Sequence, residues 1–203
     1  MHPVLGFEER NRLGRRAKML AGASVAYNVL EGIIAVSAGV AAGSIALIGF
    51  GLDSFVEVSS GLIILWQFSH RMPESRERQA QRLLAVSFFA LAAYVTVESV
   101  RALLSRAEAD HSYIGIGLAV ASLLVMPFIS IAQRRTGRAL GSAAVVADGT
   151  QTLLCTYLSG VLLAGLVVNA TLGWSWADPV AALVIGGVAV REGIEAWKGD
   201  GHC

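Results

Sequence analysis

Charged residues are scarce in this chain. Asp, Glu, Lys and Arg make up only 15% of its 203 residues, whereas a soluble domain usually carries about a quarter. Hydrophobic residues make up 55%, and the mean hydropathy is +0.61. This balance argues against a soluble globular domain and favours a protein embedded in a membrane.

Cysteine is also scarce, because the chain has only Cys155 and Cys203. Two cysteines cannot form a disulfide framework. Cys155 lies inside an apolar segment, and Cys203 ends a tail that we expect in the cytoplasm, where thiols stay reduced. We therefore expect both thiols to be free.

The sequence lacks the motifs of intramembrane enzymes. It contains no His-Glu-x-x-His, no Gly-x-Gly-Asp motif of aspartyl type, and no nucleophile paired with a base. Connections between the apolar segments are short, and no low-complexity tract is present. We predict that the protein is not an enzyme, has no prosthetic group and does not bind nucleic acid.

Six apolar segments each approach the roughly 20 residues needed to span about 30 Å of hydrocarbon. They predict an all-α bundle of six membrane helices, surrounded by lipid and forming one transmembrane domain over residues 1–203. No soluble domain is expected after the sixth segment. The predicted spans are residues 19–42, 44–68, 83–104, 113–132, 142–170 and 179–197.

Two acidic residues, Asp53 and Glu57, interrupt the second apolar segment. A charge near the bilayer centre costs roughly 3 kcal/mol on insertion scales. The i, i+4 spacing places both carboxylates on one helix face, where their oxygens can converge on one ion. Hard oxygen ligands in a membrane indicate a route for a metal cation or for protons. The alternative is a protonated pair that forms hydrogen bonds between helices.

A short internal repeat links the second and fifth segments at an offset of 98 residues. Gly43-Ser44-x-Ala46 matches Gly141-Ser142-x-Ala144, and Gly51 matches Gly149. The repeat aligns Asp53 with Gln151 and Glu57 with Cys155. Segments three crossings apart run antiparallel, which is the inverted arrangement that places transport sites near the membrane midplane.

Residues 43–57 and 141–155 resemble the second and fifth membrane helices of the cation diffusion facilitator (cation efflux) family, and the resemblance extends over all six segments. It implies a tetrahedral divalent-metal site formed by Asp53, Glu57, Gln151 and Cys155. The chain departs from the family pattern at three of these positions, because Gln151 replaces His, Cys155 replaces Asp, and Glu57 replaces Asp. Without the family context, Gln151 could equally join two helices and Cys155 would be a small buried hydrophobe.

The resemblance implies a carrier that exports a divalent cation from the cytoplasm in exchange for protons. Carboxylate and sulfur ligands suit Zn²⁺, Co²⁺, Cd²⁺ or Fe²⁺ as the transported substrate. Because the family His is absent, protons would be carried by the acids or by Cys155. A metal-binding membrane protein that does not transport is the alternative. We expect a homodimer held by membrane helices.

Three further acids lie near the predicted helices. Asp148 is expected to accept a hydrogen bond beside the ligands or to face an inner vestibule. Glu31 is expected to relay protons or to partner Asn28. Asp178, followed by Pro179, is expected to cap the start of the sixth helix.

The distribution of Lys and Arg predicts the topology, because basic residues favour the cytoplasmic side. Only Arg101 and Arg106 lie at an odd-numbered connection. The other basic residues gather in the N-terminal tail, in the second and fourth connections and at the C-terminal end: Arg10, Arg12, Arg15, Arg16, Lys18, Arg71, Arg76, Arg78, Arg82, Arg134, Arg135, Arg138, Arg191 and Lys198. We expect a multi-pass protein of the plasma (inner) membrane with both termini in the cytoplasm.

Reporter fusions test this topology. A reporter that is active only in the cytoplasm should give a signal when it is fused at Gly137 and at the C-terminus. The same reporter at Ser112 should be silent. An external C-terminus would contradict the prediction.

Overall fold

The fold was derived from a computed structural model, which describes residues 7–67, 74–105 and 109–198. Within these ranges the chain is helical and contains no strand. The helices are α1 (Phe7–Ala42), α2 (Ile45–Gln67), α3 (Glu74–Ser105), α4 (Tyr113–Leu140), α5 (Ala143–Leu172) and α6 (Ala177–Lys198). Each predicted apolar segment falls on one of these helices. Arg106 and Cys203 lie outside the described residues.

Several helices extend beyond the predicted spans. The first begins at Phe7 and not at Met19, the third at Glu74 and not at Leu83, and the fourth ends at Leu140 and not at Ala132. The added turns are rich in Arg, so hydropathy alone does not include them. Within the described residues, five helices are long and apolar enough to cross a membrane. The exception, α6, carries Asp178, Arg191 and Glu192.

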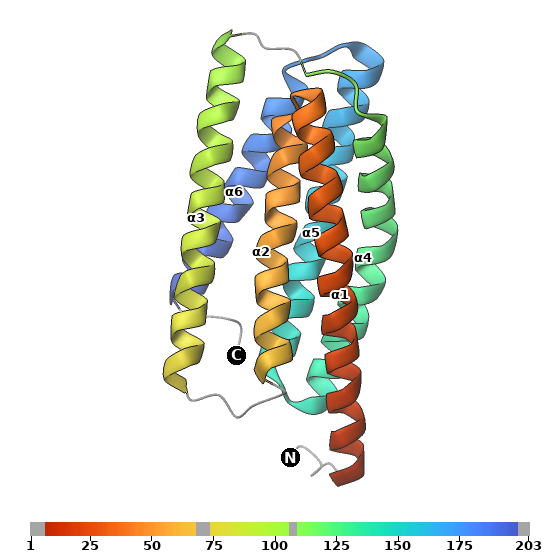
Figure 1. Cartoon of the computed structure of the whole chain (residues 1–203), viewed down its shortest axis with the longest axis vertical. Helices are drawn as coiled ribbons and strands as arrows, with labels where there is room; N and C mark the ends of the chain where they lie inside the picture. The colour runs from red at the N-terminus through yellow and green to blue at the C-terminus, as the bar shows by residue number, and fades with distance from the viewer. Residues whose placement is uncertain (1–6, 68–73, 106–108, 199–203) are drawn as a thin grey trace.

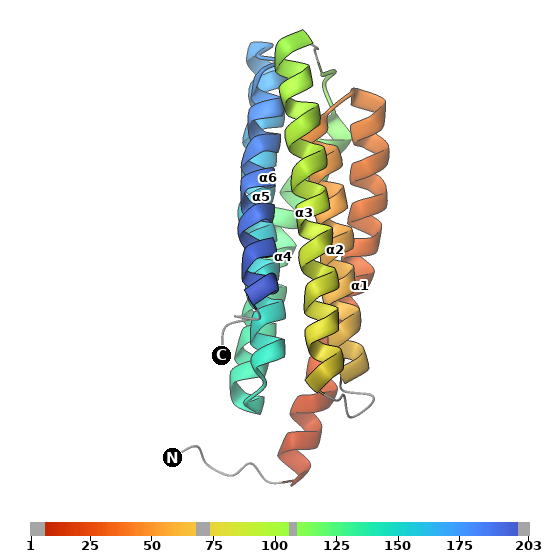
Figure 2. The same cartoon turned by 90° about the vertical axis from the view of Figure 1, so that its left-hand side faces the viewer.

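The helices form one elongated bundle (Figures 1 and 2). The helix α1 packs most extensively on α2, α4 on α5, and α3 on α6. The end of α2, the start of α3 and the α4–α5 connection lie at one end of the bundle. We call it the basic end because Arg134, Arg135 and Arg138 lie there. The chain enters α1 and leaves α6 toward the same end, as six successive antiparallel helices require. We call the other end the opposite end.

The internal repeat of the sequence corresponds to two equivalent helix hairpins. The αL residues Gly43 (φ 64°) and Gly141 (φ 69°) end α1 and α4, and the next residues, Ser44 and Ser142, donate their N–H to the carbonyls five residues earlier, each at 2.9 Å. Only a residue without a Cβ tolerates this φ at little cost. The turns of the two hairpins, α1–α2 and α4–α5, therefore have the same conformation.

Small residues draw the two helices of each hairpin together. A Cβ on Gly39 would lie 2.8 Å from the backbone N of Ile48, and a Cβ on Gly137 would lie 2.8 Å from the backbone N of Val146. Both glycines and both neighbours are related by the offset of 98 residues. Close packing of this kind is the main attraction between helices in lipid.

Asp178 differs from its predicted role. It lies inside the first turn of α6 and is 1% exposed, and its carboxylate caps α2 instead of its own helix. Ser44 Oγ donates to Asp178 Oδ1 at 2.5 Å, and the N–H groups of Ile45 and Ala46 donate to Oδ2 at 2.8 and 3.3 Å. The first N–H groups of a helix have no partner within it and favour a negative charge. Asp178 therefore joins α6 to the start of α2.

Replacing this cap should destabilise the fold. Asp178→Ala removes the acceptor for two N–H groups and one hydroxyl, so we expect a loss of about 1–2 kcal/mol of stability. Thermal unfolding in mild detergent measures the change, and Glu98→Gln, at an exposed pair with Arg101, is the control. An unfolding midpoint equal to that of the unmodified protein would contradict this role.

Candidate metal centre

Three of the predicted ligands meet in the middle of the bundle. The helix α2 places Asp53 and Glu57 on one face, and α5 brings Cys155 against them. One ligand atom from each residue lies within 4.8 Å of the others. Asp53 is 6% exposed, Glu57 5% and Cys155 0%. Two carboxylate oxygens and a sulfur thus converge in a buried site drawn from two helices.

The fourth predicted ligand, Gln151, lies one turn before Cys155 on α5 and is half-buried. Its Nε2 atom is buried and has no hydrogen-bond partner among the described residues. A buried amide without a partner is costly. Gln151 therefore carries an unpaired amide on the turn next to Cys155, and its role as the fourth ligand stays a prediction.

The first helix contributes a third side to the centre. Asn28 Nδ2 donates to Glu57 Oε2 at 2.8 Å. Ser54 Oγ donates to Glu31 Oε2 at 2.9 Å, and Cys155 Sγ lies 4.0 Å from the same oxygen. Asn28 and Glu31 are each 1% exposed. Among the described residues, Asn28 and Glu31 thus each contact a predicted ligand and not each other. A proton relay through Glu31 stays a prediction.

This involvement of α1 was missing from the predicted ligand set. The sequence did contain a signal for it, because Asn28 and Glu31 are two polar residues three apart in an apolar run. Their spacing places them on one helix face. Which partners that face meets is decided by the packing of α1 on α2 and α4, and sequence spacing alone does not show this.

Asp148 lies outside the group, on the turn of α5 that precedes Gln151 toward the basic end. It is 7% exposed. Gln133 Nε2 donates to its Oδ2 at 2.6 Å, and Ser60 Oγ lies 3.4 Å from its Oδ1. Asp148 therefore accepts hydrogen bonds from α2 and α4, one turn away from the predicted ligands.

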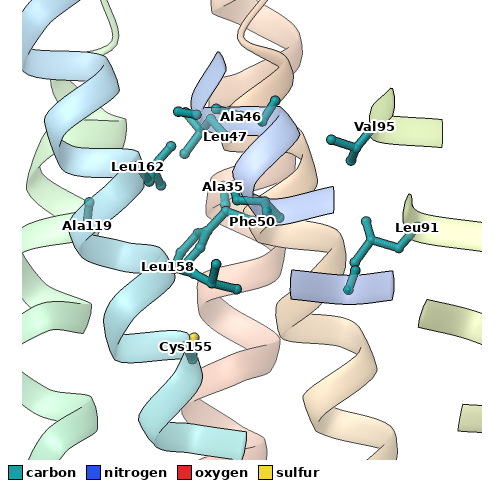
Figure 3. Packing of buried hydrophobic residues seen from close by; sticks show 14 of the residues in the cluster. Ala35, Ala46, Leu47, Phe50, Leu91, Val95, Ala119, Cys155, Leu158 and Leu162 are labelled. Carbon is teal, nitrogen blue, oxygen red and sulfur yellow. The ribbon is translucent and has the colours of Figure 1, made fainter. Parts of the chain in front are cut away.

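An apolar layer lies between the centre and the opposite end (Figure 3). Phe50 on α2 and Leu158 on α5 point toward each other next to Cys155, and Leu47 and Leu162 lie beyond them. These side chains are 0–3% exposed. On the side of the basic end, the neighbours are polar instead: Ser60, Gln133 and Asp148. The centre is thus bordered by hydrocarbon on one side and by oxygen atoms on the other. A smaller apolar cluster, Ala17, Ala21 and Val145, lies farther toward the basic end.

The three carboxylates that lie at this centre create a strong demand for positive charge. Glu31, Asp53 and Glu57 are all buried, and burying an unpaired charge is costly. Within the described residues, no Lys or Arg forms an ion pair with any of them. The arrangement therefore fits protons or a bound cation as the compensating charge.

Comparison with known proteins is consistent with this geometry. The model of the cation efflux transmembrane domain matches residues 22–198. The chain belongs to the cation efflux family. This confirms the resemblance found in the sequence and makes the chain an integral, multi-pass membrane protein of a transporter family.

Two curated relatives of this cation efflux chain extend the comparison. An uncharacterized transporter of Synechocystis is 29% identical over 155 residues, which are 71% of this chain and 50% of that protein. Transmembrane protein 163 of Xenopus laevis is 22% identical over 191 residues, 92% of this chain and 68% of that protein. The chain thus spans half the length of the first relative and about two thirds of the second.

Substitutions at the cation efflux centre test its ligands. Asp53→Asn, Glu57→Gln and Cys155→Ser should each weaken zinc or cadmium binding by about tenfold or more, which is 1.4 kcal/mol or more. Calorimetric titration in detergent measures this. Asp178→Asn, at the cap of α2, should leave the affinity for metal unchanged.

Gln151→His should tighten zinc binding, because a neutral imidazole is a good zinc ligand. The affinity should therefore decrease when the pH is lowered below about 6.5, where the imidazole becomes protonated. Equal binding by all variants would place the site elsewhere.

Proposed function

We propose that this protein is a carrier of divalent transition-metal ions that exports them from the cytoplasm. The observation that carries the proposal is the convergence of Asp53, Glu57 and Cys155 within 4.8 Å of one another, deep in a bundle of a cation-transporting family. Carboxylate and thiolate ligands together suit Zn²⁺, Co²⁺, Cd²⁺ and Fe²⁺.

In this proposal, each side chain has a separate part. Asp53 and Glu57 supply two anionic oxygens, Cys155 supplies a thiolate, and the Gln151 amide supplies a fourth, neutral donor. Asn28 orients Glu57 through its hydrogen bond of 2.8 Å. Glu31 contacts Cys155 and adds negative charge behind the ligands, which favours the loaded site.

The polarity of the bundle supports the direction of transport. The positive-inside rule places the basic end in the cytoplasm, and the oxygen atoms of Ser60 and Asp148 continue the site toward that end. Phe50 and Leu158 close the other side. In this proposal, an ion enters from the cytoplasm past the small apolar cluster of Ala17, Ala21 and Val145, and it leaves after the layer of Phe50 and Leu158 has parted.

Exchange for protons is proposed as the coupling. A site that releases a divalent ion leaves its carboxylates buried without compensation, and protons are the simplest replacement. We also propose that the carrier works as a homodimer, joined through membrane helices by close packing of small residues.

Transport in vesicles tests the function. Purified protein in proteoliposomes should take up Zn²⁺, Co²⁺ or Cd²⁺ in a saturable way, with protons moving in the opposite direction, which an internal pH dye reports. Asp53→Asn should abolish both signals, whereas Glu98→Gln should change neither. Binding without uptake would favour the alternative, a metal-binding protein that does not transport. Absence of both binding and uptake would refute the proposal.

A further inference from the structure

A second group of buried oxygen atoms lies next to the metal centre, toward the basic end. It consists of Asp148 on α5, Gln133 on α4 and Ser60 on α2. Asp148 is 7% and Gln133 1% exposed, and Ser60 is half-buried. Gln133 Nε2 lies 2.6 Å from Asp148 Oδ2, and Ser60 Oγ lies 3.4 Å from Asp148 Oδ1. Three helices thus converge on one carboxylate.

The close approach of α4 and α5 holds this group together. A Cβ on Gly149, the residue after Asp148, would lie 2.9 Å from Gln133 Cβ, so no larger residue fits there without displacing α4. Ser130 Oγ, one turn before Gln133, donates to the Gly149 carbonyl at 2.5 Å. The backbone therefore fixes the distance between the amide and the carboxylate.

One polar atom of this group lacks a hydrogen-bond partner. Gln133 Oε1 is buried and has no hydrogen-bond partner among the described residues. The unpaired oxygen belongs to the same amide whose Nε2 donates to Asp148. If the amide turns, Oε1 takes the place of Nε2 and faces the carboxylate. Two acceptor oxygens are stable together only when a cation, or the proton of a protonated carboxyl group, lies between them.

From this geometry we infer that Ser60, Gln133 and Asp148 form a second cation site. It offers a carboxylate, an amide oxygen and a hydroxyl, and no sulfur or nitrogen. Such ligands suit a hard divalent ion, for which Mn²⁺ is the probe. The inference rests on the proposed function in one respect, that an ion held here would pass on to Asp53, Glu57 and Cys155.

The position fits a site on the entry route. Asp148 precedes Cys155 by seven residues, which is about 10 Å along a helix, and Ser60 follows Glu57 by three, which is about 4.5 Å. At separations of this order, two cations in an apolar bundle repel each other. An ion at Asp148 would therefore repel one at the metal centre, and occupation of the second site would favour forward release of the first.

Counting bound Mn²⁺ by electron paramagnetic resonance tests this inference, because free Mn²⁺ gives the signal and bound Mn²⁺ loses it. In detergent, the unmodified chain should bind two ions. Asp148→Asn should bind one, because the amide keeps its hydrogen-bonding capacity but loses the charge. The double variant Asp53→Asn, Glu57→Gln should also bind one, and combining all three substitutions should abolish binding. Gln133→Glu should increase the affinity of the second site for Mn²⁺ by about tenfold.

Several outcomes separate the possibilities. If Asp148→Asn lowers the unfolding midpoint and leaves the ion count unchanged, the group only joins helices, and the inference is overturned. An unmodified chain that binds a single ion, lost in the double variant, overturns it as well. If instead the double variant behaves like the unmodified chain while Asp148→Asn still removes an ion, the second site stands and the proposed function fails.

Discussion

The structure depends on how the bundle accommodates carboxylates without water. In hydrocarbon, no solvent compensates a buried charge, so every acid needs a donor, a proton or a cation. Asn28 supplies a donor to Glu57 and Ser54 supplies one to Glu31, but these neutral groups do not cancel the charges. The packing of α1, α2 and α5 therefore creates a place where a proton or a cation would stabilise the acids, and the proposed metal site makes use of this demand.

The inverted hairpins explain why the acids of α2 meet the neutral residues of α5. Equivalent turns and equivalent glycine contacts give α1–α2 and α4–α5 the same internal geometry, and their second helices contact each other. Residues at the same register then converge, so Asp53 corresponds to Gln151 and Glu57 to Cys155. The charged half of the centre comes from one repeat, and the neutral amide and the thiol come from the other.

Local patterns predicted more of this structure than long-range ones did. Apolar runs give the six helices, and the i, i+4 spacing places Asp53 and Glu57 on one face, because both signals depend only on neighbours in sequence. The roles of Glu31 and Asp178 could not be obtained in this way. Asp178 caps a helix whose start lies 133 residues earlier, and Glu31 meets Cys155 across 124 residues. Both contacts follow from how the hairpins and α6 pack.

The apolar layer links closure of the bundle to the metal centre. Phe50 is one turn from Asp53 on α2, and Leu158 is one turn from Cys155 on α5. Each hairpin is held as a unit by backbone contacts at its glycines, whereas the two second helices meet through side chains. A movement that parts Phe50 from Leu158 therefore also draws Asp53 away from Cys155. In the proposed carrier, the same two helices carry both the apolar layer and the predicted ligands, so opening toward the opposite end would weaken metal binding in the same step.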